Sequence, residues 1–128
     1  MRVAGIGFRA AADLASLQDA LQKALEAAGG ASIDALVTES AKSRERVFQE
    51  LAQVMRIPGL GVRKDELEQM ITPTQSERIQ DRFGTGSLCE AAALAAAGPT
   101  AGLIATRAIS DDGKATAAIA ESAEEGRA

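Results

Sequence analysis

The sequence predicts an α/β domain in which helices cover both faces of a mixed, mostly parallel β-sheet that ends in a β-hairpin. Three observations lead to this three-layer α/β/α fold. Short apolar runs alternate with amphipathic segments of helical periodicity, and this alternation is typical of parallel βαβ units. Glycine or proline separates most of these segments. Two β-prone stretches close the pattern, joined by the polar residues 110–113.

The first predicted unit is a strand, a loop and a helix. Residues 3–7 form a short apolar run punctuated by glycine, which is typical of a buried strand. Asp13 is a suitable N-cap, and leucines then recur at helical spacing from Leu14. The glycine pair 29–30 should end this helix. Residues 33–38 predict the second strand.

The middle of the chain repeats this order. Residues 38–43 are polar and should form a loop at the carboxyl end of the second strand. An amphipathic pattern over residues 44–56 predicts a second helix that ends before Pro58. Residues 59–62 predict a weak third strand, and residues 64–71 a short helix.

The last third contains a helix and the hairpin. Ser76 could cap a brief turn over residues 76–83. The nearly apolar segment 88–97 predicts a helix that is largely buried. Residues 103–109 and 114–120 predict the two strands of the hairpin.

The composition excludes several classes of protein. The 128 residues suit one domain, expected over residues 1–120, with a disordered acidic tail over residues 121–128. Without His and with one Cys, the chain can form neither a Ser-His-Asp triad nor a structural zinc site. We therefore expect no metal and no cofactor, and the single Cys fits a reducing cytoplasm. A net charge of −4 and only three aromatic residues argue against nucleic acid, and no apolar run is long enough for a membrane span.

Ligands of open α/β sheets bind beyond the carboxyl ends of the strands. This rule selects three segments as candidates for the site. They are the loop over residues 7–12, the loop over residues 38–43, and the glycine-rich elbow over residues 84–87.

The first glycine pair has two interpretations. Gly5-x-Gly7 after a strand is similar to part of a dinucleotide fingerprint, but Ala10 stands where the third glycine should fall. The alternative is that these glycines only let a helix approach the strand closely, which requires no ligand.

The elbow Gly84-Thr85-Gly86-Ser87 also has two interpretations. Free backbone N–H groups at a helix N-terminus can bind an anion. Alternatively, Ser87 and Glu90 form a capping box, in which Ser87 accepts from the Glu90 N–H and the Glu90 side chain bonds back.

Cations lie in or near the candidate loops. Arg9, Lys42, Arg44 and Arg107 are the members of this set. Arg107 interrupts an apolar strand, so it lies either on a solvated edge or in a site where it and Lys42 converge on an acidic ligand. Cys89 is expected to be buried and to contribute to packing.

Several motifs together resemble a known family. They are Val3 to Gly7 with Arg9, Thr38 with Lys42, Ser76-Glu77, Gly84-Thr85, Glu90 to Leu94, and Thr116 to Ala120. This chain resembles, over nearly its whole length, the cobalamin biosynthesis family of CobE and the CbiG C-terminal domain. It departs from the family pattern at Gln75, where proline is frequent, and at Arg107, where lysine is frequent.

The resemblance implies a compact three-layer α/β domain in the vitamin B12 pathway. CbiG is associated with opening the ring-A lactone of cobalt-precorrin-5A, but in a longer protein, and the stand-alone form belongs to the oxygen-dependent route. We therefore expect a protein that binds a corrin-ring precursor as a carrier or accessory factor. The alternatives are a lactone hydrolase, with Glu39, Glu77 or Glu90 as general base, and a structural partner of a precorrin methyltransferase.

Corrin precursors carry many carboxylates, which backbone amides and cations would complement. On this basis we predict a substrate site whose members all lie in or beside the candidate segments. They are Gly5, Gly7, Arg9, Thr38, Lys42, Gly84, Thr85, Gly86, Ser87, Glu90 and Arg107.

Overall fold

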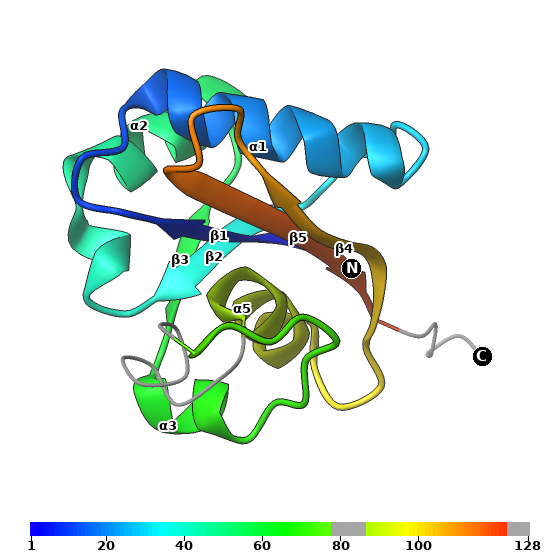
Figure 1. The fold of residues 1–128 in the computed structure, drawn as a ribbon. Coiled ribbons are helices and arrows are strands. Elements are labelled where there is room, and N and C mark those ends of the chain that lie inside the picture. The colour runs from blue at the N-terminus through cyan, green and yellow to red at the C-terminus, as the bar shows by residue number, and fades with distance from the viewer. Residues whose placement is uncertain (78–86, 123–128) are drawn as a thin grey trace.

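The computed structural model describes residues 1–77 and 87–122. Within them, five strands form one sheet in the order β3-β2-β1-β5-β4 (Figure 1). The strands are β1 (Arg2–Phe8), β2 (Ala35–Glu39), β3 (Gly59–Val62), β4 (Gly102–Ile109) and β5 (Ala115–Glu121). Strands β1, β2 and β3 are parallel, and β5 is antiparallel to both β1 and β4. Four strands thus share one direction, which confirms the predicted mixed, mostly parallel sheet with its closing hairpin.

Helices cover both faces of the sheet (Figure 1). One face carries α1 (Leu14–Ala27) and α2 (Arg46–Met55), and the other carries α3 (Lys64–Glu68) and α5 (Leu88–Ala97). Alternation along β1 sends Ala4, Ile6 and Phe8 to the first face and Val3 to the second. Each face therefore has its own hydrophobic core, as a three-layer fold requires.

The ends of α1 follow the sequence signals. Asp13 is the N-cap, and its carboxylate accepts from the Ser16 N–H at 3.0 Å. After the helix, Gly29 and Gly30 adopt φ values of 79° and 78°. This left-handed conformation strains residues that carry a Cβ atom, so the glycine pair explains why the helix ends there.

Small residues bring α5 close to the sheet. A Cβ atom added to Gly5 would lie 1.9 Å from the carbonyl oxygen of Cys89 in α5. Ala91, Ala92 and Ala93 are fully buried on the helix side of this contact. These three are among the 28 alanines of the chain. Because an alanine side chain is a single methyl group, they allow the helix to pack closely against the sheet.

Some boundaries differ from those predicted. A 3₁₀ turn, η1 (Lys42–Arg44), precedes α2, and α3 ends earlier than the expected residue 71. Glu121, assigned to the tail from the sequence, pairs with Arg2 inside the β1–β5 ladder, since the Arg2 Nε–Glu121 Oε2 distance is 2.8 Å. The rest of the expected tail from residue 123, and most of the turn predicted over residues 76–83, lie outside the described residues.

Candidate functional site

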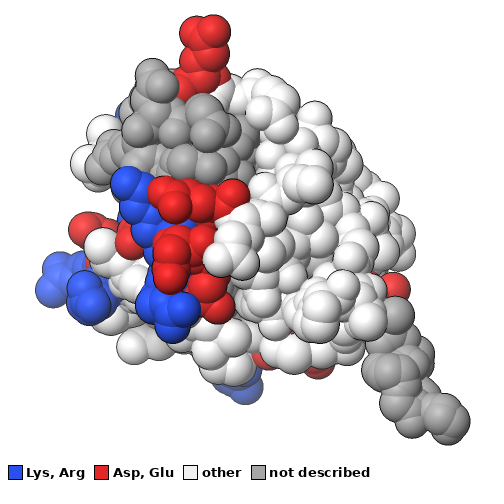
Figure 2. Space-filling view, turned by 90° about the horizontal axis from the view of Figure 1, so that it is seen from below, with Lys and Arg blue, Asp and Glu red and all other residues white. Residues whose placement is uncertain are grey.

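The predicted loops over residues 7–12 and 38–43 lie at one edge of the molecule. Strands β1 to β4 all end at this edge, and the residues that follow β1, β2 and β3 are rich in charge. Figure 2, which looks onto the face that carries α3 and α5, shows charged side chains gathered on one side and a broad uncharged surface on the other. The α5 part of this face consists largely of alanine. We call the region where β1 to β4 end the carboxyl edge.

Lys42 connects two loops of the carboxyl edge. Its ammonium group donates a hydrogen bond to the Phe8 carbonyl oxygen at 2.7 Å and lies 4.5 Å from the centre of the Phe8 ring. Phe8 stacks in turn on Phe48 of α2, with the ring centres 6.5 Å apart. The aromatic pair and the carbonyl together hold the positive charge beside the end of β1.

A shallow cavity opens beside Lys42. Its volume is about 190 Å³, and it is lined by Phe8, Ala10, Glu39, Ala41, Lys42, Glu45 and Val47. Apolar side chains and three ionisable groups, two of them carboxylates, therefore meet at one point. Glu39 also fixes the loop, because its carboxylate accepts from the Lys42 backbone N–H at 3.2 Å.

Two further cationic residues, Arg9 and Lys114, lie beyond this cavity at the carboxyl edge. The Arg9 N–H donates to the Lys114 carbonyl oxygen at 2.9 Å, so these residues are neighbours where β1 meets β5. Neither side chain forms an ion pair within the described part of the chain, and the same holds for Arg44. Lys42, Arg9 and Lys114 form what we call the cation row. No local sequence pattern indicates Lys114, because its proximity to Arg9 depends on the pairing of β1 with β5.

Thr38 lies inside the protein at the end of β2. Its side chain is fully buried, and its hydroxyl has no hydrogen-bond partner among the described residues. An unpartnered hydroxyl in a protein interior is unusual and costs stability. Thr38 is close in sequence to the cavity residues Glu39, Ala41 and Lys42. Because its side chain is buried inside the protein, it does not line the cavity.

Gly5 and Gly7 lie against α5. The backbone of Cys89 and Ala93 occupies the space beside Gly5, and a Cβ atom on Gly7 would lie 2.6 Å from the Thr116 hydroxyl oxygen. These contacts support the interpretation that the glycine pair serves helix–strand packing.

The predicted capping box is half formed. The Ser87 hydroxyl accepts from the Glu90 N–H at 3.5 Å, as expected. The expectation that Glu90 bonds back to the cap is wrong. Its carboxylate accepts instead from the Thr74 N–H at 2.9 Å, the Thr74 hydroxyl at 2.8 Å and the Arg107 N–H at 2.8 Å. These tertiary donors outcompete the local one because they satisfy both carboxylate oxygens of a fully buried side chain.

Arg107 and Lys42 lie on different sides of the sheet at the carboxyl edge. Arg107 belongs to the edge strand β4 and is half-buried near the first turn of α5, whereas Lys42 lies over Phe8 on the side of α2. Cys89, in the first turn of α5, is fully buried. Burial raises the pKa of the Cys89 thiol to about 11, so it is neutral and serves packing, as predicted.

The remaining predicted residues belong to the glycine-rich elbow before α5. Gly84, Thr85 and Gly86 lie outside the described residues. Among residues 1–77 and 87–122, no group of three or more acidic or Cys side chains could hold a metal ion. No helix in that same part of the chain is long and apolar enough to cross a membrane.

Comparison with known proteins identifies related sequences and structures. Residues 2–120 match the family model described as cobalamin synthesis G C-terminus. The crystal structure of CobE, a protein from the cobalamin (vitamin B12) biosynthetic pathway, superposes with a TM-score of 0.82 and 28% identity, covering 94% of this chain and 89% of CobE. Cobalamin biosynthesis protein chiG from Agrobacterium tumefaciens str. C58 gives a TM-score of 0.75 and 34% identity, covering 97% of this chain and all of chiG.

A third structure shows the same fold within a longer protein. A putative cobalamin biosynthesis protein G homolog from Sulfolobus solfataricus has a TM-score of 0.70 and 20% identity. The match covers 97% of this chain but only 37% of that protein. A search of curated protein sequences found no significant match.

Proposed function

Because the chain belongs to the family of cobalamin synthesis G C-terminal domains and takes part in cobalamin biosynthesis, we propose that it binds a corrin-ring precursor as a carrier or accessory factor. The carboxyl edge is the proposed binding region. The single observation that carries this proposal is the cation row, Lys42, Arg9 and Lys114, beside a cavity of about 190 Å³.

The chemistry of the cation row suits a ligand with several carboxylates. Among the described residues, the Arg9 and Lys114 side chains form no ion pair, so their charged groups gain most from an anionic partner. The row extends along the edge, so it can meet carboxylates on the rim of a large ring. The chain as a whole has a net charge of −4, and this local arrangement is what favours an anion.

Titration with hydrogenobyrinic acid, a metal-free corrin carrying acetate and propionate groups, tests the proposal. We expect micromolar binding by wild-type protein, followed by the change in corrin absorbance. Lys42→Ala and Arg9→Gln should each weaken binding about tenfold, the value of one charge-assisted hydrogen bond. Arg56→Gln is the matched control, because Arg56 is a cation at the end of α2, outside the carboxyl edge. Equal affinity of all four proteins would refute the assignment.

The position of Glu39 favours a second candidate function, a hydrolase that opens the ring-A lactone. Glu39 lines the same cavity as Lys42, so a carboxylate could deprotonate a water while the ammonium group stabilises negative charge on the lactone oxygen. Release of a two-carbon aldehyde or acid from a late precorrin would support this candidate. Glu39→Gln should abolish that release and leave binding intact. If the wild-type protein binds the precorrin but releases no product, the hydrolase function is excluded and the carrier function is the one that remains.

A further inference from the structure

Glu90 is a fully buried carboxylate outside the cavity beside Lys42. It lies in the first turn of α5 and accepts three hydrogen bonds, two from Thr74 and one from the backbone of Arg107. It thereby joins three segments that are separate in sequence, namely the turn around Thr74, the start of α5 and the edge strand β4.

The donors to Glu90 are all uncharged groups. Within the described part of the chain, no Lys or Arg forms an ion pair with its carboxylate. Burying an ionisable group costs free energy that neutral donors only partly recover. A neutral or apolar residue could fill this space at lower cost, so packing alone does not account for a carboxylate here.

The contact with Arg107 coincides with an irregularity in β4. The register between β4 and β5 shifts between Ala105 and Ala108. The Arg107 N–H lies within this interval and donates to Glu90. A bulge redirects the side chains of the strand in which it occurs, so the contact with Glu90 lies where the side chains of β4 change direction.

The guanidinium of Arg107 is left available by this arrangement. It forms no ion pair with any residue that the structure describes, and Arg107 is half-buried near the carboxyl end of its strand. The start of α5 lies beside the end of β1, since a Cβ atom on Gly7 would lie 3.8 Å from the backbone nitrogen of Cys89. Arg107 is thus held at the carboxyl edge, on the α5 side of the sheet.

We propose that Glu90 is a positioning residue, which fixes the bulge in β4 and so holds the Arg107 guanidinium for a carboxylate on the side of the ligand opposite the cation row. The inference rests on the proposed function, because it assigns a second anchoring point to the same corrin-type ligand. Glu90 itself does not touch the ligand.

A double-mutant cycle tests this inference. Glu90→Gln keeps the shape of the side chain, but one acceptor becomes an NH₂ group that cannot accept from a backbone N–H. We expect Glu90→Gln and Arg107→Ala each to weaken binding of hydrogenobyrinic acid about tenfold. The double variant should lose no more than either single variant, because both changes remove the same anchor.

Two measurements separate positioning from a general loss of stability. Cys89→Ala is the matched control, since it shortens another fully buried side chain in the same turn and removes none of the three hydrogen bonds that the Glu90 carboxylate accepts, and it should bind as wild type. Amide hydrogen exchange of ligand-free Glu90→Gln should be faster at Thr74 and Arg107 and unchanged in β1.

The outcomes distinguish this inference from the proposed function. If Glu90→Gln binds as wild type, if the two losses multiply to about a hundredfold, or if Cys89→Ala loses as much affinity, the inference is overturned while the corrin site stands. If wild-type protein does not bind the corrin, both are overturned. Unchanged exchange at Arg107 in Glu90→Gln would overturn the role of the bulge directly.

Discussion

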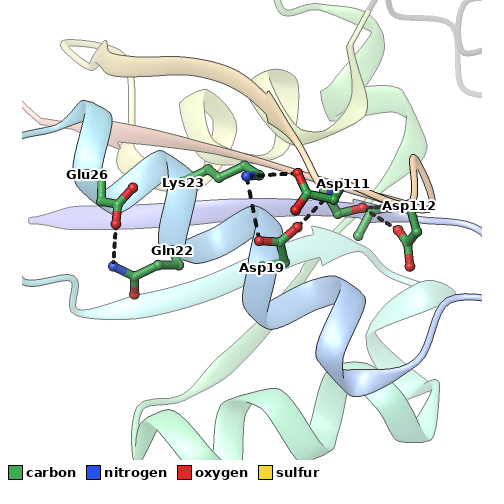
Figure 3. Close-up of polar contacts among 8 residues, drawn as sticks. Asp19, Gln22, Lys23, Glu26, Asp111 and Asp112 are labelled. Atoms are coloured by element: carbon green, nitrogen blue, oxygen red, sulfur yellow. Dashed lines mark hydrogen bonds and ion pairs between the residues drawn. The ribbon is translucent and has the colours of Figure 1, made fainter.

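The hydroxyl of Ser16 in α1 donates a hydrogen bond to the carboxylate of Asp112 in the β4–β5 hairpin. The hairpin is fastened to α1 at a second point, where Lys23 lies 3.1 Å from Asp111 and 3.7 Å from Asp19 (Figure 3). The Asp111 N–H also donates to the Asp19 carboxylate at 2.7 Å. These contacts fix the hairpin, which carries Lys114 of the cation row, against the helix.

The Asp112 contacts predict that acid destabilises the protein. Hydrogen bonds from the Ser110 hydroxyl, the Ser16 hydroxyl and the Lys114 N–H lower the pKa of Asp112 to about 2, well below the usual value of an Asp carboxyl. A carboxyl whose pKa is depressed in the folded state stabilises the fold above its unfolded pKa, and this contribution is lost as the pH falls toward about 2. Asp112→Asn should lower the melting temperature at pH 7 and flatten its dependence on pH between about 4 and about 2. Circular dichroism melts of both proteins measure this, and parallel curves would contradict the prediction.

Gly5→Ala should destabilise the protein severely. The added Cβ atom would lie 1.9 Å from the Cys89 carbonyl oxygen and 2.8 Å from the Ala93 nitrogen, and both are backbone atoms that cannot rotate away. We expect a loss of about 3 kcal/mol or more in the free energy of unfolding, measured by urea denaturation. Gly102→Ala is the control, because no atom of the described residues other than its own chain neighbours lies within 4 Å of its added Cβ, and it should change stability by less than about 1 kcal/mol.

Cys89 should be unreactive in the folded protein. Its thiol is fully buried, and burial raises its pKa to about 11, so the reactive thiolate is scarce at pH 8. A chromogenic disulfide reagent should label Cys89 at the rate of global unfolding in native buffer and within seconds in strong denaturant. Rapid labelling of the native protein would show that the start of α5 opens locally.

Salt should weaken ligand binding through the cation row. Arg9, Lys42 and Lys114 would meet ligand carboxylates near solvent, where ions screen attraction over roughly 8 Å at physiological ionic strength. The affinity for hydrogenobyrinic acid should therefore fall as sodium chloride rises, and the slope should be smaller in Arg9→Gln. Arg56→Gln should keep the wild-type slope, and a salt-independent affinity would exclude charge pairing as the source of binding.

Lys42→Met should destabilise the fold as well as weaken binding. The substitution keeps the apolar stem but removes the hydrogen bond to the Phe8 carbonyl oxygen and the contact with the Phe8 ring. We expect a loss of about 1–2 kcal/mol in the free energy of unfolding. Urea denaturation of Lys42→Met beside Lys114→Met checks this, because the Lys114 ammonium group has no such contacts in the described structure and its loss should be nearly neutral.

The local sequence determined the elements and several of their ends. Leucine spacing, the cap at Asp13 and the glycines at 29 and 30 predicted α1 correctly, because these signals act between residues a few positions apart. The absence of His and the single Cys likewise limited the possible chemistry before any fold was considered. The carboxyl edge was also predictable, since it follows from strand direction alone.

Only the tertiary structure decided which distant residues meet. The sequence did not place β5 beside β1, so it could not bring Lys114 next to Arg9. It also favoured the nearest partner for Glu90, whereas the fold supplies donors from Thr74 and from the bulge at Arg107. A local sequence pattern predicts only contacts between residues within one or two helical turns. A buried carboxylate instead accepts hydrogen bonds from whichever donors lie beside it in the folded protein. The sequence therefore determined the layers and the edge at which the four parallel strands end, and the packing of those layers decided which charges are held there.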